Sequence, residues 1–463
     1  GKRESERPTM STTMRHLLSP DLSEYGAEAG MGLLDPQPKH TTRHLLQNAK
    51  PHHRKAVQLA LSDLFGRRAE AILRLPRSWE HAIAHRVLAD PRDLPIALTL
   101  LQCALWIVLS CSLQIALLPR DAGIGALSVG VFATHVVITW AILGQRFILA
   151  MHYTAHRSLI SPRIPFASAL NQLPQLVLAN FWGMPAGMYH LHHCVMHHGS
   201  NNIFPWDLSG TTGYRRDTVL GLLHYIANFV IHTFLFLPYY AVCKQRYGLA
   251  ALSVASMIGY FATFHVLCSL HPPVFWISLG FSSIVGPCAL MTGNFAQHQF
   301  INPRDPTSNY GLTINLIAAP FNMLTFNDGY HIVHHLNSVA HWSEMPLYFI
   351  KNLDEYEKQD ALIFHSLDYM MVAGLIYTGQ LEKLASYAVQ LRPVPRSNKE
   401  LAEILRERLQ PLPNTTGKLD TPKKLVFGLQ QVMWILLFWA GAPSAIFPAI
   451  MLPVFFVISY AHA

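Results

Sequence analysis

Long runs without a charged side chain restrict this sequence to a few kinds of fold. The run from Leu94 to Leu118 contains no Asp, Glu, Lys or Arg, and a helix of that length can cross the hydrocarbon core of a bilayer. A second uncharged run covers 122–145, and the Pro-Arg-Asp sequence at 119–121 between the two runs predicts a tight turn. Together the two runs predict a transmembrane hairpin.

Three further apolar stretches follow, at 219–243, 249–270 and 274–292. Histidine-rich segments lie before and after them, and these segments must end on one side of the membrane if they share a site. Three crossings would separate them, so one stretch should not cross. Lys244-Gln245-Arg246 follows the first stretch, and basic residues favour the cytoplasmic side. We therefore expect 219–243 to lie along the interface and the other two to form a second hairpin that turns at 271–273.

The fold class expected from these patterns is an all-α integral membrane protein with about four transmembrane helices in two hairpins. Interfacial helices and a helical cytoplasmic domain that holds the functional site would complete it. Residues 164–189, which three prolines interrupt, should be re-entrant or interfacial. The expected divisions are a cytoplasmic region with amphipathic helices at 1–93, a catalytic membrane domain at 94–350, a cytoplasmic helical region at 351–424, and an apolar segment at 425–463, either a short hairpin or one span with an interfacial helix.

The composition agrees with a membrane protein. Charged residues make up 13% of the chain, about half of the usual share. The net charge of +8 suits a cytoplasmic face that meets anionic lipid headgroups. The positive charge is spread thinly and no nucleic-acid-binding module is visible, so nucleic acid is not expected as a partner. The six cysteines show no paired framework and predict free thiols.

Histidine is the unusual residue, with 26 in the chain. The first group is HYTAH, with His152 and His156 four residues apart on one face of a predicted helix. The second is HCVMHH, in which His193 and His197 would share a face and His198 would point about 100° further round, toward a second metal. Two nearby histidines, His190 and His192, are additional, and either could replace His193 as a ligand.

Two more groups follow the last apolar stretches. NFAQH places Asn294 and His298 four residues apart, and an asparagine amide oxygen can hold a metal-bound water. HIVHH supplies three histidines, His331, His334 and His335. Asp328 lies just upstream and could accept a hydrogen bond from the second ring nitrogen of a ligand.

These groups predict a site for two metal ions. They supply nine imidazoles and one amide, from His152, His156, His193, His197, His198, His298, His331, His334, His335 and Asn294. Zinc takes three or four ligands, so the set suits two ions with four to five ligands each. Ligation by nitrogen with few carboxylates suits iron, which would activate dioxygen. The alternative is a His-rich segment that binds stray metal, and four groups on one predicted side of the membrane count against it.

With HYTAH, HCVMHH, NFAQH and HIVHH in place, the sequence resembles the membrane fatty acid desaturase superfamily over roughly 94–350. That family carries three histidine boxes, and the resemblance implies a four-span helical bundle with a cytoplasmic cap that holds a di-iron centre. The second box here has three residues between its histidines instead of two, as in some alkane-hydroxylase-like members. This departure leaves open which of His190, His192 and His193 is the ligand, and whether the product is an alkene or an alcohol.

The resemblance implies an oxidoreductase that uses two irons and O2 to form a double bond in a fatty acyl or similar lipid chain. The HPGG signature of a fused cytochrome b5 domain is absent from the sequence, so a separate electron donor such as cytochrome b5 or ferredoxin is expected. The lipid would enter a narrow apolar tunnel near Trp182, Tyr189, Phe295, Phe326 and Trp342, although core or belt positions suit each of these aromatics as well. Arg146, Arg157 or Arg304 could meet an anionic headgroup or only follow the positive-inside rule.

Three other functions remain open. A hydroxylase or ketolase of the same fold, acting on a lipid or isoprenoid, would share the metal ligands and differ in how it places the substrate. A membrane zinc hydrolase or receptor would need fewer histidines, usually with a carboxylate. A metal transporter would place its histidines in the middle of the bilayer. The expected location is multi-pass in the membrane with the metal site facing the cytoplasm, in the endoplasmic reticulum if the source is eukaryotic.

Overall fold

The computed structural model describes residues 39–66, 72–322, 324–412 and 421–461, and these are mostly helical. Up to the end of the bundle the helices are α3 (Lys39–Asn48), α4 (Arg54–Leu61), α5 (Arg77–Ala82), α6 (Leu94–Leu117), α7 (Ala126–Val136), α8 (Gly144–His156), α9 (Ala167–Leu176), α10 (Met188–His190), α11 (His198–Ser200), α12 (Val219–Cys243), α13 (Tyr247–Leu270), α14 (Pro272–Phe275) and α15 (Phe281–Gln297). They are followed by α16 (His331–Leu336), α17 (Met345–Lys351), α18 (Leu353–Lys358), α19 (Tyr369–Tyr377), α20 (Leu381–Ala385), α21 (Asn398–Arg408), α22 (Thr421–Trp439) and α23 (Ile446–Ala461). Two short strands, β1 (Asn315–Ile317) and β2 (Ile363–His365), pair in parallel with Asn315 opposite Ile363.

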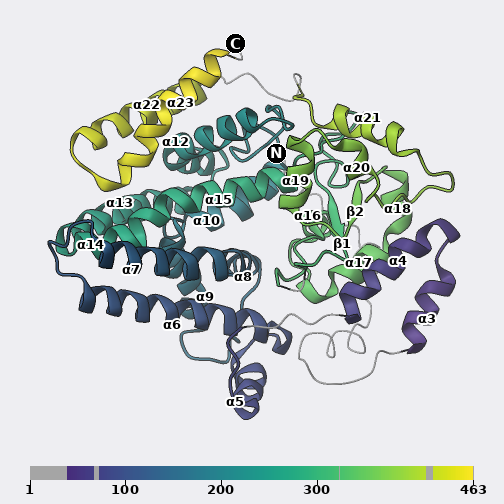
Figure 1. Cartoon of the computed structure of the whole chain (residues 1–463), viewed down its shortest axis with the longest axis horizontal. Helices are drawn as coiled ribbons and strands as arrows, with labels where there is room; N and C mark the ends of the chain where they lie inside the picture. Colours follow the sequence, from purple (N-terminus) through teal and green to yellow (C-terminus); the bar gives the residue numbers. More distant parts are fainter. Residues whose placement is uncertain (1–38, 67–71, 323, 413–420, 462–463) are drawn as a thin grey trace, which may run out of the picture.

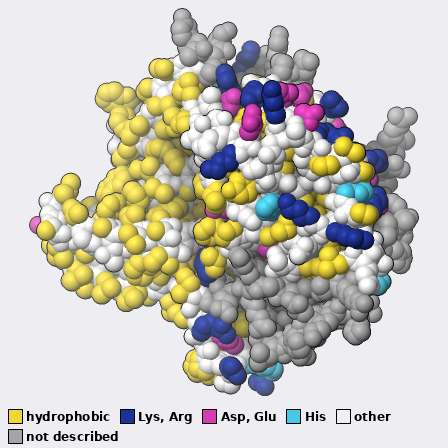
Figure 2. Space-filling model, turned by 45° about the vertical axis from the view of Figure 1, so that its right-hand side comes forward, with side chains coloured by type: hydrophobic (Ala, Val, Ile, Leu, Met, Phe, Trp, Pro, Cys, Tyr) yellow, Lys and Arg dark blue, Asp and Glu magenta, His cyan; other side chains and the backbone are white. Residues whose placement is uncertain are grey.

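Four helical stretches in the described residues are long and apolar enough to cross a membrane: Pro91–Leu117, Val219–Cys243, Tyr247–Leu270 and Pro272–Gln297. They lie with α7 in the left-hand part of the molecule, while α4, α16 to α21 and both strands form the right-hand part (Figure 1). Hydrophobic side chains cover the first part and charged side chains gather on the second (Figure 2). Because an exposed apolar face of this extent is unfavourable in water, these four candidate spans indicate an integral, multi-pass membrane protein.

The second predicted span is bent. α7 continues through a π-helical segment at Val137–Ile142, and α8 leaves it at an angle of 51°. At the bend the Leu143 N–H donates to the carbonyl of Ile138, five residues back, and the indole of Trp182 donates to the carbonyl of Thr139. The run at 122–145 is therefore a broken helix that extends to His156, and the bend sets the direction in which the first histidine pair points.

The helix at 219–243 is continuous and as long as the spans around it. Its expected placement along the interface stays a prediction. The C-terminal apolar segment forms two helices, α22 and α23, that pack on α12 as a hairpin (Figure 1). Gln430 and Trp434 fix this contact, because they bond to the Leu235 N–H and the Ile231 carbonyl on α12, each at 2.7 Å.

The right-hand part is anchored by residues from the N-terminal segment. Asp63 accepts hydrogen bonds from the Ala318 N–H, the Asn322 amide and the Tyr330 hydroxyl at 2.6 to 3.0 Å. Asp93 accepts from His341 and from the indole of Trp342. These contacts fix the loop before α16 and the loop after it. Part of the segment 1–93, residues 1–38 and 67–71, lies outside the described residues; the division of the chain at 93, 350 and 424 stays a prediction.

We expect Gly286→Ala to destabilise the protein, because α15 passes very close to the segment Leu178–Trp182. A Cβ atom at Gly286 would lie 2.1 Å from the carbonyl oxygen of Trp182, and overpacking of this kind costs about 1–3 kcal/mol. Gly259→Ala on α13 is the matched control, since its Cβ would meet nothing within 4 Å. Thermal unfolding in detergent should show a lower Tm for the first variant only; equal Tm values would contradict this close approach.

Candidate metal centre

The four histidine groups meet at the junction between the membrane helices and the right-hand part of the molecule. α8 brings the first group, the π-helical segment Leu191–His197 with α11 brings the second, and α16 brings the fourth. His298 follows directly after the end of α15. The nine imidazoles form two adjacent clusters, and the ring centroids of His198 and His335, one from each cluster, are 4.9 Å apart.

The first cluster contains five histidines. One ring nitrogen from each of His152, His156, His193 and His334 lies within 4.8 Å of the others. His198 joins them, because its Nε2 is 3.1 Å from Nε2 of His193 and 3.0 Å from Nε2 of His334. Three Nε2 atoms that face one another at such distances form a donor set that a single cation can bridge.

The second cluster contains four histidines. Ring nitrogens of His197, His298 and His335 lie within 4.8 Å of one another, and Nε2 of His335 is 3.3 Å from Nε2 of His298. The ring of His331 lies beside them, with its centroid 4.9 Å from that of His335 and 5.2 Å from that of His298. Its two nitrogens have no hydrogen-bond partner among the described residues.

The second group is divided between the clusters differently from the expectation. In a regular α-helix His193 and His197 would share a face, with His198 turned toward the other ion. Here the segment is π-helical, and the N–H of His198 donates to the carbonyl of His193 five residues back. This wider turn brings residues five apart onto one face, so His193 and His198 enter the first cluster and His197 enters the second.

Hydrogen bonds to the opposite ring nitrogens orient three of the imidazoles. Nδ1 of His197 donates to Asp207 at 2.7 Å, and Nδ1 of His298 donates to the carbonyl of Leu312 at 2.9 Å. Nδ1 of His152 lies 3.1 Å from the hydroxyl of Tyr189. When Nδ1 carries the proton, Nε2 presents its lone pair, and Nε2 of His197 is buried and has no hydrogen-bond partner among the described residues. This pattern is typical of metal ligands.

The chemistry of this donor set fits metal ions. Buried nitrogens normally have hydrogen-bond partners, yet Nε2 of His197 and both ring nitrogens of His331 in the second cluster have none among the described residues. Burial, and then the repulsion between neighbouring imidazolium charges, lowers the pKa of His193, His334 and His335 well below the usual 6.5. The rings are therefore neutral near pH 7, as metal coordination requires.

Asp207 takes the role that the sequence suggested for Asp328. Burial alone would raise the pKa of Asp207, but His197 and Ser209 lower it to about 2, so its carboxylate stays ionised. Asp328 lies 3.9 Å from Nδ1 of His331, beyond hydrogen-bond distance, and accepts from Gln297 instead. No histidine spacing pointed to Asp207; the available signal was a lone carboxylate in an uncharged stretch nine residues after the second box.

Three other predicted residues lie beside the clusters. His190 is exposed, and Nε2 of His192 is 3.0 Å from the hydroxyl of Ser209. His193 is thus the member of this trio whose ring nitrogen lies in a cluster. The amide nitrogen of Asn294 donates to the Ser209 carbonyl and the Tyr225 hydroxyl, which leaves its amide oxygen as the group available to the site.

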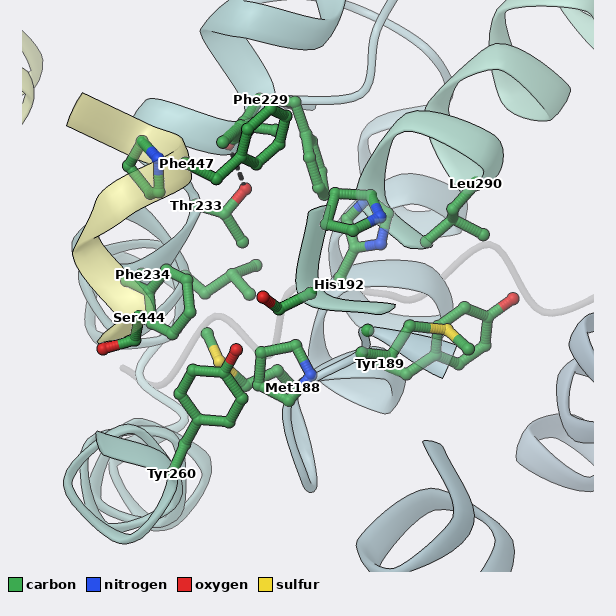
Figure 3. A pocket seen from close by; sticks show the side chains of 18 residues that line it. Met188, Tyr189, His192, Phe229, Thr233, Phe234, Tyr260, Leu290, Ser444 and Phe447 are labelled. Carbon is green, nitrogen blue, oxygen red and sulfur yellow. Dashed lines mark hydrogen bonds between the residues drawn. The ribbon is translucent and has the colours of Figure 1, made fainter. Parts of the chain in front are cut away.

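A cavity of about 830 Å³ runs beside the first cluster, and His152 and His193 form part of its wall. Its membrane side is lined by residues of the α7–α8 bend and of α15, and its other side by 316–329 and 368–370. Tyr189 lines it as expected, whereas Trp182, Phe295, Phe326 and Trp342 are buried elsewhere in the core. A smaller apolar pocket lies next to this cavity, and Tyr189, His192 and Leu290 line both of them. Ser444 and Phe447 of the C-terminal hairpin form the opposite wall of the smaller pocket (Figure 3).

Comparison with known protein families gives one match. The model of the family described as fatty acid desaturase matches residues 126–367, which is just over half of the chain and includes all four histidine groups. Comparisons with curated proteins and with solved structures give no significant match.

We expect Asp207→Asn to weaken metal binding at the second cluster only. Loss of the carboxylate removes the group that orients His197, and such changes weaken metal affinity about 10–100-fold. After dialysis against a chelator, metal analysis should find about one ion per chain in place of about two. Asp217→Asn is the control, because Asp217 pairs with the half-exposed Arg215. Equal metal content in the two variants would show that Asp207 does not support a ligand.

Proposed function

The chain belongs to the fatty acid desaturase family, and from this membership and the geometry of the site we propose that it is an O2-dependent di-iron oxidoreductase that introduces a double bond into a fatty acyl or similar lipid chain. The observation that carries the proposal is the pair of adjacent, buried histidine clusters in the wall of a large cavity. Its apolar side lies between membrane helices, where a lipid chain is available.

In this proposal each cluster holds one iron. His152, His156, His193, His198 and His334 would bind the first ion, and His197, His298, His331 and His335 would bind the second. Asn294 lines the cavity and is proposed to hold a water at the second ion through its amide oxygen. The split into five and four nitrogen ligands suits two ions of ordinary coordination number.

Two bound irons would supply the reduction of O2 and the removal of hydrogen from an unactivated carbon. In the overall reaction two adjacent carbons lose two hydrogen atoms, the donor protein supplies two electrons, the solvent supplies two protons, and one O2 becomes two waters. Asp207, Tyr189 and the Leu312 carbonyl keep the imidazoles oriented. The apolar wall keeps water from the reacting carbons and holds the chain in one position, and this position decides between an alkene and an alcohol.

Electrons are proposed to come from a separate protein such as cytochrome b5 or ferredoxin. The metal site is proposed to face the cytoplasm, since it adjoins the right-hand part of the molecule, on whose surface charged residues gather (Figure 2). In a eukaryotic source the endoplasmic reticulum is the proposed membrane.

Metal content and product analysis of the purified chain test this proposal together. We expect about two irons per chain and an alkene product when O2, a reductant and a lipid are supplied. His334→Ala removes a nitrogen that faces two other histidines, so it should lower iron content and reduce turnover by more than about 100-fold.

His190→Ala is the matched control, because His190 belongs to the same histidine-rich stretch as His193 but is exposed. It should retain iron and turnover. One zinc per chain, or iron content unaffected by His334→Ala, would overturn the di-iron proposal and favour a zinc hydrolase or receptor. An alcohol or ketone as the main product would keep the di-iron centre and replace desaturation by hydroxylation or ketolation.

A further inference from the structure

The cavity beside the first cluster is apolar at one end and polar at the other. Trp140, Ile284 and Cys288 line the apolar end. The polar end is lined by Gln297, Asn322, Thr325, Asp328, Asp368 and Tyr369. This end reaches the molecular surface, because Phe321 and Met370, which also line it, are 41% and 53% exposed. A lipid that occupies the cavity would therefore place its chain in the apolar end and its head group in the polar end.

The polar end carries negative charge. Two carboxylates, Asp328 and Asp368, line it, and the described residues of the lining include no Lys or Arg. The sequence suggested three arginines as partners of an anionic headgroup, and none of them lines the cavity. Arg157 donates instead to the Val339 carbonyl and to Asp90. The other two are Arg146 and Arg304. Lys55 contacts His365 and is also outside the lining.

Both carboxylates keep an oxygen that can accept a hydrogen bond from a ligand. Asp328 is only 8% exposed, and its Oδ2 accepts from Gln297 at 2.9 Å. Its Oδ1 lies 3.9 Å from Nδ1 of His331, beyond hydrogen-bond distance, and makes no hydrogen bond with the described residues. Oδ1 of Asp368 accepts from the Met371 N–H at 2.8 Å and caps α19, which leaves Oδ2. The hydroxyl of Tyr369 is engaged with the Asp328 carbonyl. The polar atoms at this end that have no hydrogen-bond partner among the described residues are thus carboxylate oxygens, which accept hydrogen bonds.

An anionic head group would fit this end poorly. The free Oδ2 of Asp368 accepts hydrogen bonds, and no Lys or Arg among the described residues of the lining could pair with an anion. An anionic head group would therefore lose its water without gaining a cationic partner. A hydroxyl, amide or ammonium group can instead donate to the free oxygens of Asp328 and Asp368.

Building on the proposed function, we propose that the lipid oxidised at this site carries a head group that donates hydrogen bonds and bears no negative charge. The head lies between Asp328 and Asp368, and the chain extends past His152 and His193 toward the α7–α8 bend. Long-chain alcohols, amides and amines share this chemistry, whereas free fatty acids and coenzyme A thioesters do not.

A series of lipids that share one saturated chain and differ only in the head group tests the proposal. The iron-loaded full chain in detergent is titrated with the alcohol, the primary amide, the amine, the carboxylate and the coenzyme A thioester, each displacing a fluorescent long-chain alcohol. All five lipids are titrated at the same pH and ionic strength. We expect the three uncharged or cationic donors to bind at least about tenfold more tightly than the carboxylate and the thioester. Equal or tighter binding of either anionic lipid would overturn the proposal.

Charge changes at Asp368 provide the second measurement. Asp368→Lys should improve carboxylate binding at least about tenfold relative to alcohol binding. Asp368→Asn keeps a side chain that can cap α19 and should shift the ratio in the same direction by a smaller factor, so the proposal stays testable if the lysine variant does not fold. Glu382→Lys is the control, since Glu382 is exposed on α20 and outside the lining. An unchanged ratio in Asp368→Asn would overturn the assignment of the head group to this end.

The two proposals fail in different ways. If the carboxylate or the thioester binds best and is converted to an alkene, the head-group assignment is wrong and the desaturase function stands. If metal analysis finds no iron and no lipid of the series is oxidised, the proposed function fails, whichever head group binds best.

Discussion

Nine imidazoles packed against one another, with few other partners, are the constraint around which this fold is arranged. Such a cluster is unfavourable by itself, because buried nitrogens without hydrogen-bond partners forgo the stabilisation that water would give them. The chain holds them in place with elements that come from distant parts of the sequence: the bend between α7 and α8, the π-helical turn before α11, the end of α15, and α16. Metal ions that satisfy these nitrogens would convert this local cost into a gain in stability.

The network behind the histidines links the site to the rest of the molecule. Asp207 orients His197, and it is itself held by Ser209, whose carbonyl accepts from Asn294 and from Tyr225 of α12. On the other side Asp63 fixes the loop that leads into α16. The site therefore depends on contacts with the N-terminal segment and with α12, and α12 in turn is held by the C-terminal hairpin.

The lengths of the uncharged runs and the spacing of the histidines predicted those features of the fold and the site that depend on local sequence. The span limits at 94–118, 249–270 and 274–292 follow from bilayer thickness, and the pair His152 and His156 lies on one face of α8 because four residues make about one helical turn. The π-helical register that exchanged His197 and His198 could not be read in the same way. The segment 191–197 is π-helical, and a rule based on spacing assumes a regular α-helix. Asp207 was not predicted for a related reason, since the loop after α11 folds back and brings Asp207 against His197 of the second box.

The charge of the cavity bears on regiochemistry as well as on the choice of head group. Both proposed irons are fixed to the protein, so the carbon that reacts is whichever one the chain presents beside His152 and His193. A chain held only by its apolar wall could slide along the cavity, because contacts with methylene groups are alike at every position. A head group hydrogen-bonded at Asp328 and Asp368 removes that freedom, since those bonds exist at one position only. The distance between the polar end and the metal site then determines which carbon of the chain reacts. The apolar end needs only enough room for the rest of the chain.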